Sequence, residues 1–149
     1  MKTITTLLLL TLLICNYSFG EIPQLQNALA TLEQQSSIAR GSIIQISKTE
    51  FRYDYYDVNE KDSDFEFLIA KGYQGGGPSW EGIVYGILTL ENPKILTEIR
   101  FDAEGEGLSI ISSSKASLEK IALLVAKVKS NRSLLLKAIE RAKKDQHME

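Results

Sequence analysis

The chain is rich in β-branched and aromatic residues from Gly41 to Tyr56, and apolar and polar positions alternate from Phe51, a period typical of β-strands. Ile43, Ile44 and Ile46 precede a polar stretch, and aromatic residues then recur at every second position from Phe51. This pattern predicts a β-hairpin whose turn lies at residues 47–50. Two further strands are predicted at residues 95–101 and 107–112. They flank the turn of residues 102–106, whose Gly105 supplies the positive φ that such a turn needs.

Helical spacing dominates the second half of the chain. Trp80, Ile83, Val84, Ile87 and Leu88 form one apolar stripe, which predicts a central amphipathic helix with Ser79 as its cap and an end at Asn92-Pro93. Two more helices follow, with Ser114 and Asn131 as their caps; their apolar stripes are Leu118, Ile121, Ala122, Val125 and Val128, then Leu134, Leu135, Ala138, Ile139 and Ala142.

These elements predict an α+β fold for residues 41–149. It is a small, mainly antiparallel sheet packed against C-terminal antiparallel helices and the central amphipathic helix. The short apolar run at residues 65–69 suits either a strand or a helix. Residues 57–64 are polar and predict a surface loop. Residues 21–40 form an N-terminal extension, and Leu25, Leu29 and Leu32 are spaced as in a helix.

The first twenty residues have the layout of a secretory signal peptide. Lys2 precedes an apolar run that ends at Cys15, and small residues at Ser18 and Gly20 place the cleavage site before Glu21. We therefore expect export to the periplasm or secretion. The bulky Ile14 stands where a lipoprotein signal carries a small residue, so lipidation at Cys15, the one feature that would attach the protein to a membrane, is not expected.

Composition limits the chemistry of the exported domain. The chain has a formal net charge of −2 and no basic tract, which argues against nucleic-acid binding. Cys15 is the only cysteine and His147 the only histidine, and His147 falls in a tail expected to fray. No metal site, cofactor site or nucleophile motif is present in the sequence, so no enzyme activity is predicted.

The glycine-rich stretch of residues 72–82 is the most specific feature. Gly75, Gly76 and Gly77 precede Trp80 and Glu81 at a helix start, where backbone N–H groups bind anions in some proteins. The same glycines also suit a loop that only feeds a packed helix. Trp80 suits either the core or a contact surface, and Glu81 suits either a helix-dipole partner or an acid-base group.

Six carboxylates lie close together between Asp54 and Glu66: Asp54, Asp57, Glu60, Asp62, Asp64 and Glu66. Such a run is typical of a solvated loop, or alternatively of an acidic patch that steers a basic protein partner. Tyr73 and the tyrosines of residues 53–56 add contact area suited to a protein surface.

Residues 72–82, GYQGGGPSWEG, followed by an amphipathic helix, then IRFDAE at residues 99–104 and paired helices, resemble the immunity protein 51 family over residues 41–143. The resemblance implies a small α+β protein, encoded beside a bacterial polymorphic toxin, that neutralises this cognate protein toxin by binding it. The partner-binding residues expected on this basis are Tyr73, Gly75, Gly76, Gly77, Trp80, Glu81, Asp54 and Asp57. The alternatives are an extracytoplasmic small-ligand or glycan-binding domain, and a hydrolase that uses Glu81 and Asp102.

Overall fold

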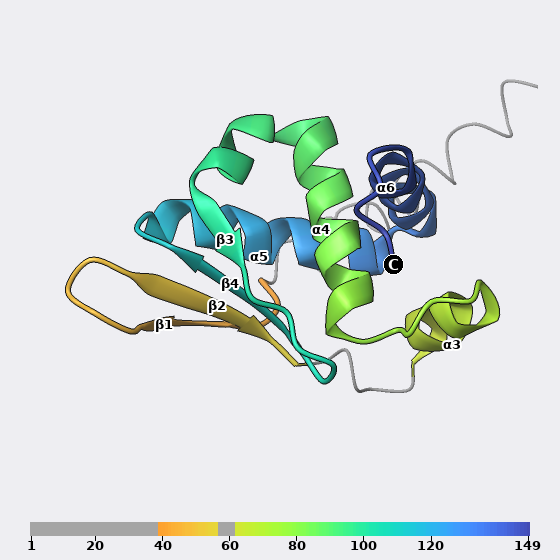
Figure 1. Cartoon of the computed structure of the whole chain (residues 1–149), viewed down its shortest axis with the longest axis horizontal. Coiled ribbons are helices and arrows are strands. Elements are labelled where there is room, and N and C mark those ends of the chain that lie inside the picture. The colour runs from red at the N-terminus through yellow and green to blue at the C-terminus, as the bar shows by residue number, and fades with distance from the viewer. Residues whose placement is uncertain (1–38, 57–61) are drawn as a thin grey trace, which may run out of the picture. The chain divides into compact units, whose positions relative to one another are not determined.

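A computed structural model describes residues 39–56 and 62–149, all within one compact unit, Ser36–Glu149 (Figure 1). The predicted signal peptide, residues 1–20, and residues 21–38 of the predicted N-terminal extension lie outside the described residues. Residues 57–61, which include Asp57, also lie outside them. The described elements, in chain order, are β1 (Ser42–Gln45), β2 (Phe51–Tyr55), α3 (Ser63–Ala70), α4 (Gly77–Glu91), the 3-10 helix η2 (Pro93–Thr97), β3 (Ile99–Phe101), β4 (Leu108–Ser112), α5 (Lys115–Ser130) and α6 (Arg132–Lys144).

The four strands form one antiparallel sheet in the order β1-β2-β4-β3. Tyr53 lies opposite Ile110, and Tyr55 lies opposite Leu108. Since alternate side chains of a strand point to opposite faces, these four share one face of the sheet, and all are fully buried. The other face carries Ile111, which is buried but lies outside the main hydrophobic cluster.

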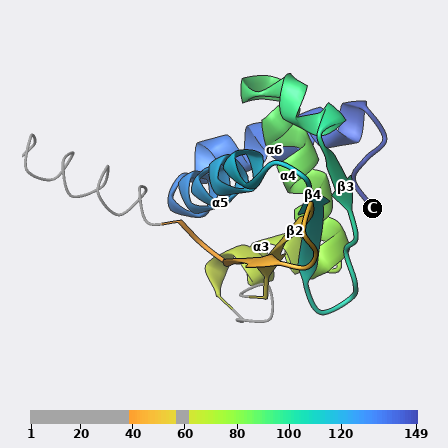
Figure 2. The same ribbon diagram turned by 90° about the vertical axis from the view of Figure 1, so that its left-hand side faces the viewer.

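The buried face of the sheet packs against α5 and α4. Figure 2 shows α5 on one side of the sheet. The apolar stripes predicted for the helices supply the core, because Ile83, Ile87, Leu118 and Ile121 are all inaccessible to solvent. The core therefore lies between the sheet and the helices.

The second C-terminal helix packs mainly on α4. A single residue, Asn131, joins α5 to α6 and caps α6 by accepting the Leu134 N–H at 3.0 Å. Figures 1 and 2 show α6 running across α5 rather than back alongside it. This single-residue connection turns the chain towards α4.

The structure confirms the α+β class, the hairpin of β1 and β2, the end of α4 at Asn92, and the caps at Ser114 and Asn131. Three details of the prediction are wrong. The strand expected at residues 95–101 is only Ile99–Phe101, because Pro93 opens a 3-10 turn first. The cap of α4 is Gly76 rather than Ser79. Gly105 lies in its turn without a positive φ.

The expected loop at residues 57–64 is also wrong at its end, because α3 begins at Ser63. Asp62 caps this helix, accepting the N–H groups of Asp64 and Phe65 at 2.9 Å each. Asp62 is therefore structural. Within the described residues, no helix is long and apolar enough to cross a membrane.

Candidate functional site

The glycine loop is a packed structural element. A Cβ atom on Gly77 would lie 2.0 Å from the carbonyl oxygen of Glu104, and one on Gly76 would lie 2.3 Å from that of Gly105. Gly75 has a φ of +78°, and its Cβ would meet the Phe65 ring at 2.8 Å. Of the two readings of these glycines, the structure supports close approach of backbones over an exposed anion cradle.

The last residues described hold this loop in place. The Glu149 carboxylate accepts the Ser79 hydroxyl and, at 3.0 Å, the backbone N–H of Gln74. Ser79 Oγ in turn accepts the Gly75 N–H at 2.9 Å. The negative charge of this carboxylate at the start of α4 also interacts favourably with the helix dipole. The N–H groups of Gln74 and Gly75 are thus engaged by side chains of the protein, and that of Gly77 donates to the Gly105 carbonyl.

Trp80 belongs to the core. Its side chain is 2% exposed, and its ring meets the Tyr55 ring edge-on at 5.2 Å between centroids. Lys129 Nζ lies 5.5 Å from the centroid of the indole ring. A partner that docks on the folded protein therefore reaches the atoms around Trp80 and not the ring itself.

Glu81 lies at the surface next to Trp80, half-buried against the turn that joins β3 to β4. Burial raises the pKa of the Glu81 carboxyl, while the backbone N–H of Ala103 and the nearby His147 act in the opposite direction. Its environment therefore favours the neutral acid more than water does.

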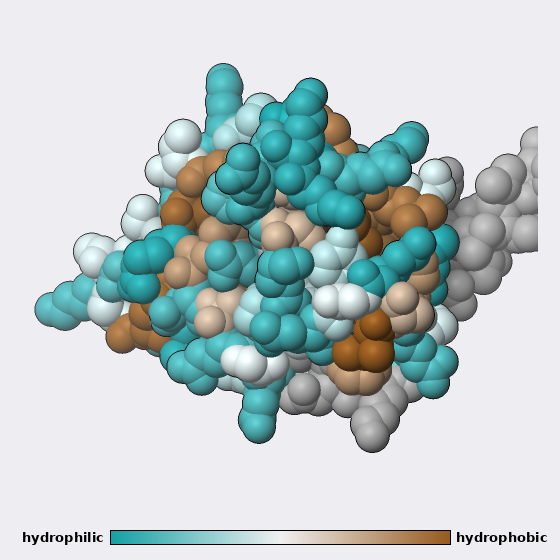
Figure 3. All heavy atoms as spheres, turned by 45° about the vertical axis from the view of Figure 1, so that its right-hand side comes forward, coloured by the Kyte–Doolittle hydropathy of each residue, from teal (hydrophilic) through white to brown (hydrophobic). Residues whose placement is uncertain are grey.

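Four acidic residues lie on segments that meet at the first turn of α4. We call Glu81, Asp102, Glu104 and Glu149 the acidic rim, since their segments meet at the glycine loop. Asp102 lies 3.9 Å from Arg100 Nη1, but both side chains are more than half exposed, so this pair neutralises little. Tyr73 lies on the same loop, partly exposed and packed against the core. Figure 3 shows hydrophilic side chains covering much of this side of the molecule.

Three carboxylates of the acidic run predicted between Asp54 and Glu66 have partners within the protein, whereas Glu66 is exposed and Asp57 and Glu60 lie outside the described residues. Asp54 is 5% exposed, and its carboxylate accepts Arg52 Nε at 3.0 Å and the Ser109 hydroxyl at 2.7 Å. Asp62 pairs with Lys129, and Asp64 pairs with both Lys129 and Arg132. These three carboxylates are compensated within the protein. Their pairing fixes β2 and α3 and offers little charge to a partner.

Sequence reasoning missed the role of residues 145–149. The tail was expected to fray around His147, yet the His147 ring stacks on Tyr85 with centroids 3.6 Å apart. Asp145 forms an ion pair with Arg141, with Oδ2 2.9 Å from Nε, and a Cβ on Gly82 would lie 2.8 Å from the Met148 sulfur. The available signal was Gly82, since a glycine inside a helix marks a close neighbour.

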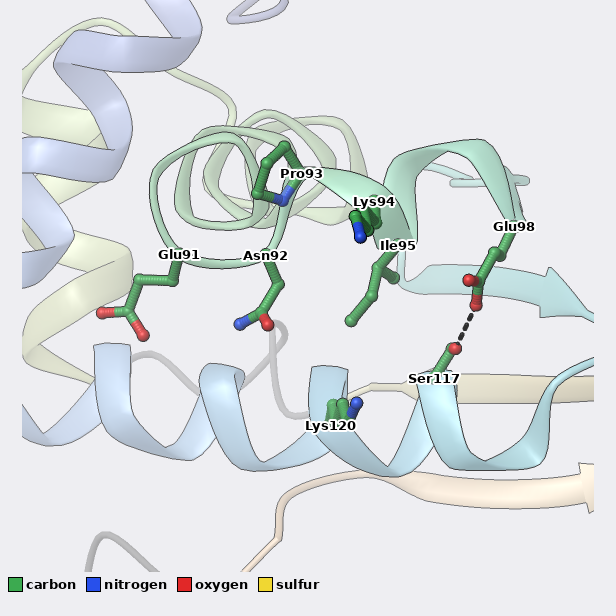
Figure 4. A pocket seen from close by; sticks show the side chains of 8 residues that line it. All are labelled: Glu91, Asn92, Pro93, Lys94, Ile95, Glu98, Ser117 and Lys120. Atoms are coloured by element: carbon green, nitrogen blue, oxygen red, sulfur yellow. Dashed lines mark hydrogen bonds between the residues drawn. The ribbon is translucent and has the colours of Figure 1, made fainter.

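A groove of about 360 Å³ lies apart from the glycine loop, between α5 and the junction of α4 with η2 (Figure 4). Asn92, Ile95 and Lys120 line it, and at one end Glu98 accepts the Ser117 hydroxyl. At the other end Glu91 pairs with Lys127 at 2.8 Å. Both carboxylates are already engaged, so the groove presents its amide and lysine groups to solvent.

Within the described part of the chain, no three histidine, cysteine, aspartate or glutamate side chains are grouped to hold a metal ion. Glu81 and Asp102, the pair weighed for hydrolysis, flank Ala103, but Asp102 is well exposed and lies beside Arg100. What the site does offer is a hydrophilic surface whose loop is packed tightly onto a small α+β domain.

The sequence profile of the family described as Immunity protein 51 matches residues 45–144. The chain belongs to the immunity protein 51 family. No curated protein and no solved structure matches it. The family name assigns these proteins to toxin immunity, which is generally a non-enzymatic role that implies a cognate toxin as partner.

Proposed function

We propose that this protein neutralises its cognate toxin by binding it directly, with the acidic rim and Tyr73 covering the toxin's functional site. The observation that carries the proposal is the convergence of Glu81, Asp102, Glu104 and Glu149 on the segment that the sequence singled out, in a member of an immunity protein family. Clustered carboxylates attract a basic surface and accelerate association with it.

The rigidity of the loop supports the same proposal. Gly76 and Gly77 lock the loop to the turn of residues 102–107, and Glu149 holds it from the other side. A surface that does not rearrange loses little entropy when it binds, so its affinity is higher for the same contacts. In this proposal Trp80 and the buried Asp54 support the surface from below.

The proposed location of this activity is outside the cytoplasm, because residues 1–20 have the layout of a signal peptide. The test is cell fractionation of the native host followed by mass measurement of the purified protein. Recovery from the periplasm or medium with Glu21 as the first residue is expected. Recovery from the cytoplasm with Lys2 and Cys15 retained would overturn export while leaving toxin binding open.

The test of neutralisation begins with the protein as immobilised bait for the secreted and envelope proteins of its source bacterium, identified by mass spectrometry. A toxin captured in this way is then expressed in cells with and without the protein. Survival only with the protein, together with a stable complex of the two purified proteins, is the expected result. Cells that die despite a formed complex would overturn neutralisation by binding.

The variants that test the surface are Glu104→Lys and Asp102→Lys, because both side chains are exposed and their loss leaves the core intact. Each reversal is expected to weaken the complex at least about tenfold, by like-charge contact with a basic partner. Lys143→Glu on the exposed side of α6 is the matched control and should leave affinity unchanged.

The alternative, a small-ligand or glycan-binding domain, relied on a pocket formed by the glycine loop and the tyrosines. The groove of Figure 4 includes neither. Saturable binding of an envelope glycan, lost on Tyr73→Ala, would favour that alternative over toxin binding.

A further inference from the structure

Strand β1 is an edge of the sheet. Among residues 39–56 and 62–149, it pairs only with β2, so its other side has no neighbouring strand. Its sequence, Ser42-Ile43-Ile44-Gln45, is uncharged and followed by Ile46. Edge strands usually carry a charge, a proline or a bulge that prevents pairing with another strand, and β1 has none of these devices.

The hydrogen bonds of the hairpin show which residues of β1 face outwards. The Ile46 N–H donates to the Glu50 carbonyl at 3.0 Å, and the register continues through Ile44 opposite Arg52. Since hydrogen-bonded and non-hydrogen-bonded pairs alternate along an antiparallel ladder, Ser42 and Ile44 bond to β2. Ile43 and Gln45 therefore direct their N–H and C=O groups to the unpaired edge.

Apolar surface surrounds this edge. Ile44 and Ile46 are 42% and 41% exposed on the outer face of the sheet. On the inner face, a groove of about 350 Å³ runs between β1 and α5, lined by Ile43, Ala122 and Leu123, with Leu123 43% exposed. A strand added to β1 would cover apolar side chains on both faces of the sheet.

We propose that a second copy of this chain occupies the edge, joining β1 to β1 about a twofold axis at Ile44. In this register Ile43 of one copy lies opposite Gln45 of the other. The outward N–H and C=O groups of both residues then form hydrogen bonds in both strands, as twofold symmetry requires. Ile44 then lies opposite Ile44 as a non-hydrogen-bonded pair, where side chains approach most closely. The inner-face side chains of the added strand extend over the groove beside Leu123.

The charges around the groove favour a second copy over a basic or acidic peptide. The strand itself is neutral, and Lys115 and Glu119 on the groove wall carry one charge of each sign, 3.4 Å apart. Such a surface is self-complementary, as a twofold interface must be, because every contact occurs twice. A toxin bound at the acidic rim involves other residues, so this inference does not depend on the proposed function.

The first experiment measures the mass of the full chain, purified as the cell produces it, by light scattering and sedimentation over a range of concentrations. We expect a monomer–dimer equilibrium. Gln45→Pro removes an outward N–H without touching the bonds to β2, and Ile44→Lys places two ammonium groups opposite each other. Each should raise the dissociation constant at least about tenfold, while Leu90→Lys and Leu136→Lys, at exposed leucines on α4 and α6, should not.

The second experiment tests the register. Ile44→Cys in a Cys15→Ser chain should form a disulfide-linked dimer under mild oxidation, since opposed Cβ atoms in such a pair are about 4.5–5.5 Å apart. Leu90→Cys in the same background should not. A protein that stays monomeric at all concentrations overturns the proposal, as does a dimer that Ile44→Lys and Gln45→Pro leave unchanged. Slow amide exchange at Ile43 and Gln45 in a monomer would assign the edge to another segment of the same chain, and also overturns it.

Discussion

Gly86 of α4 and Ala138 of α6 meet so closely that a Cβ atom on Gly86 would lie 2.0 Å from the Ala138 carbonyl oxygen. Both residues are buried, and the obstructing atom belongs to a helix backbone that cannot move aside alone. This contact explains how α6 packs on α4 although the two helices are far apart in sequence. It also explains a glycine in the middle of a helix, where it has a poor propensity.

Gly86→Ala should therefore destabilise the protein by about 3 kcal/mol, because overpacking against backbone outweighs the gain in helix propensity. The free energy of unfolding, measured by urea denaturation, is the readout. Gly105→Ala is the control: no atom lies within 4 Å of its Cβ position and its φ is not positive, so stability should change by less than about 0.5 kcal/mol. Equal effects at both positions would contradict the packing explanation.

A second prediction compares two lysines of α5. The Lys129 side chain is 8% exposed between Asp62 and Asp64, whereas Lys127 makes its ion pair with Glu91 at the surface. Lys129→Met removes the ion partner of Asp62 and one of the two partners of the buried Asp64, and should cost about 3 kcal/mol. Lys127→Met should cost less than about 1 kcal/mol. Similar losses for the two variants in urea unfolding would show that burial does not strengthen the network.

A third prediction concerns acid stability. Burial on its own would raise the pKa of Asp62, but the hydrogen bonds from Lys129, Phe65 and Asp64 and the charge of Lys129 hold it below its usual value of 3.8. The ionised carboxylate therefore stabilises the fold above that value, and the contribution is lost as the pH falls through the folded-state pKa. Asp62→Asn, which can still cap α3, should be less stable than the parent at pH 7.

The difference between Asp62→Asn and the parent should shrink as the pH falls below 3.8, because the parent carboxylate becomes protonated. Unfolding free energies at several pH values from 7 to 3 measure it. A difference that stays constant over this range would assign the loss to the cap and not to the charge.

The sequence predicted the fold class because period and caps are local signals. The alternation from Phe51, the stripe from Leu118 and the cap at Asn131 each depend on residues close in the chain. Helix α3 was missed at its start for the same reason. Its capping residue Asp62 resembled a loop carboxylate, and its ion partner Lys129 lies far along the chain.

The candidate site was predicted only in outline. The sequence indicated the glycine loop, Glu81 and Tyr73, but their surroundings depend on long-range contacts with the turn at Glu104 and with Glu149. The structure shows partners for Asp54, Asp62 and Asp64 of the predicted acidic run, and it brings Glu81 close to Ala103 on the turn that carries Asp102 and Glu104. No local pattern predicts that the Asp54 carboxylate accepts the Ser109 hydroxyl across the sheet.

A fourth prediction separates Trp80 from Tyr73. Trp80→Ala removes a fully buried ring and should cost about 4 kcal/mol of stability. Tyr73→Ala, at a partly exposed residue, should weaken toxin binding with a smaller loss of stability. The intrinsic fluorescence of the single tryptophan should lie at short wavelength when folded and shift to the red on unfolding. Tryptophan emission at long wavelength in the native protein would contradict the burial of Trp80.

The last prediction concerns Glu81, whose pKa is raised in the folded protein. For an acid this means that the neutral form is favoured, so its stabilisation is complete below the unfolded pKa and is lost as the pH rises through the folded one. At pH 7 the charged Glu81 makes the fold less stable than a neutral residue would. Glu81→Gln, whose amide oxygen can still accept the Ala103 N–H, should therefore raise the unfolding temperature at pH 7 and have no effect at pH 4.

Glu81→Gln should at the same time weaken the toxin complex, because it removes one charge of the acidic rim. A carboxylate that lowers stability is expected where its charge serves binding. Unfolding temperature and toxin affinity, measured on the same variant, separate the two effects. Increased stability with unchanged affinity would place Glu81 outside the toxin contact and leave Asp102, Glu104 and Tyr73 to form it.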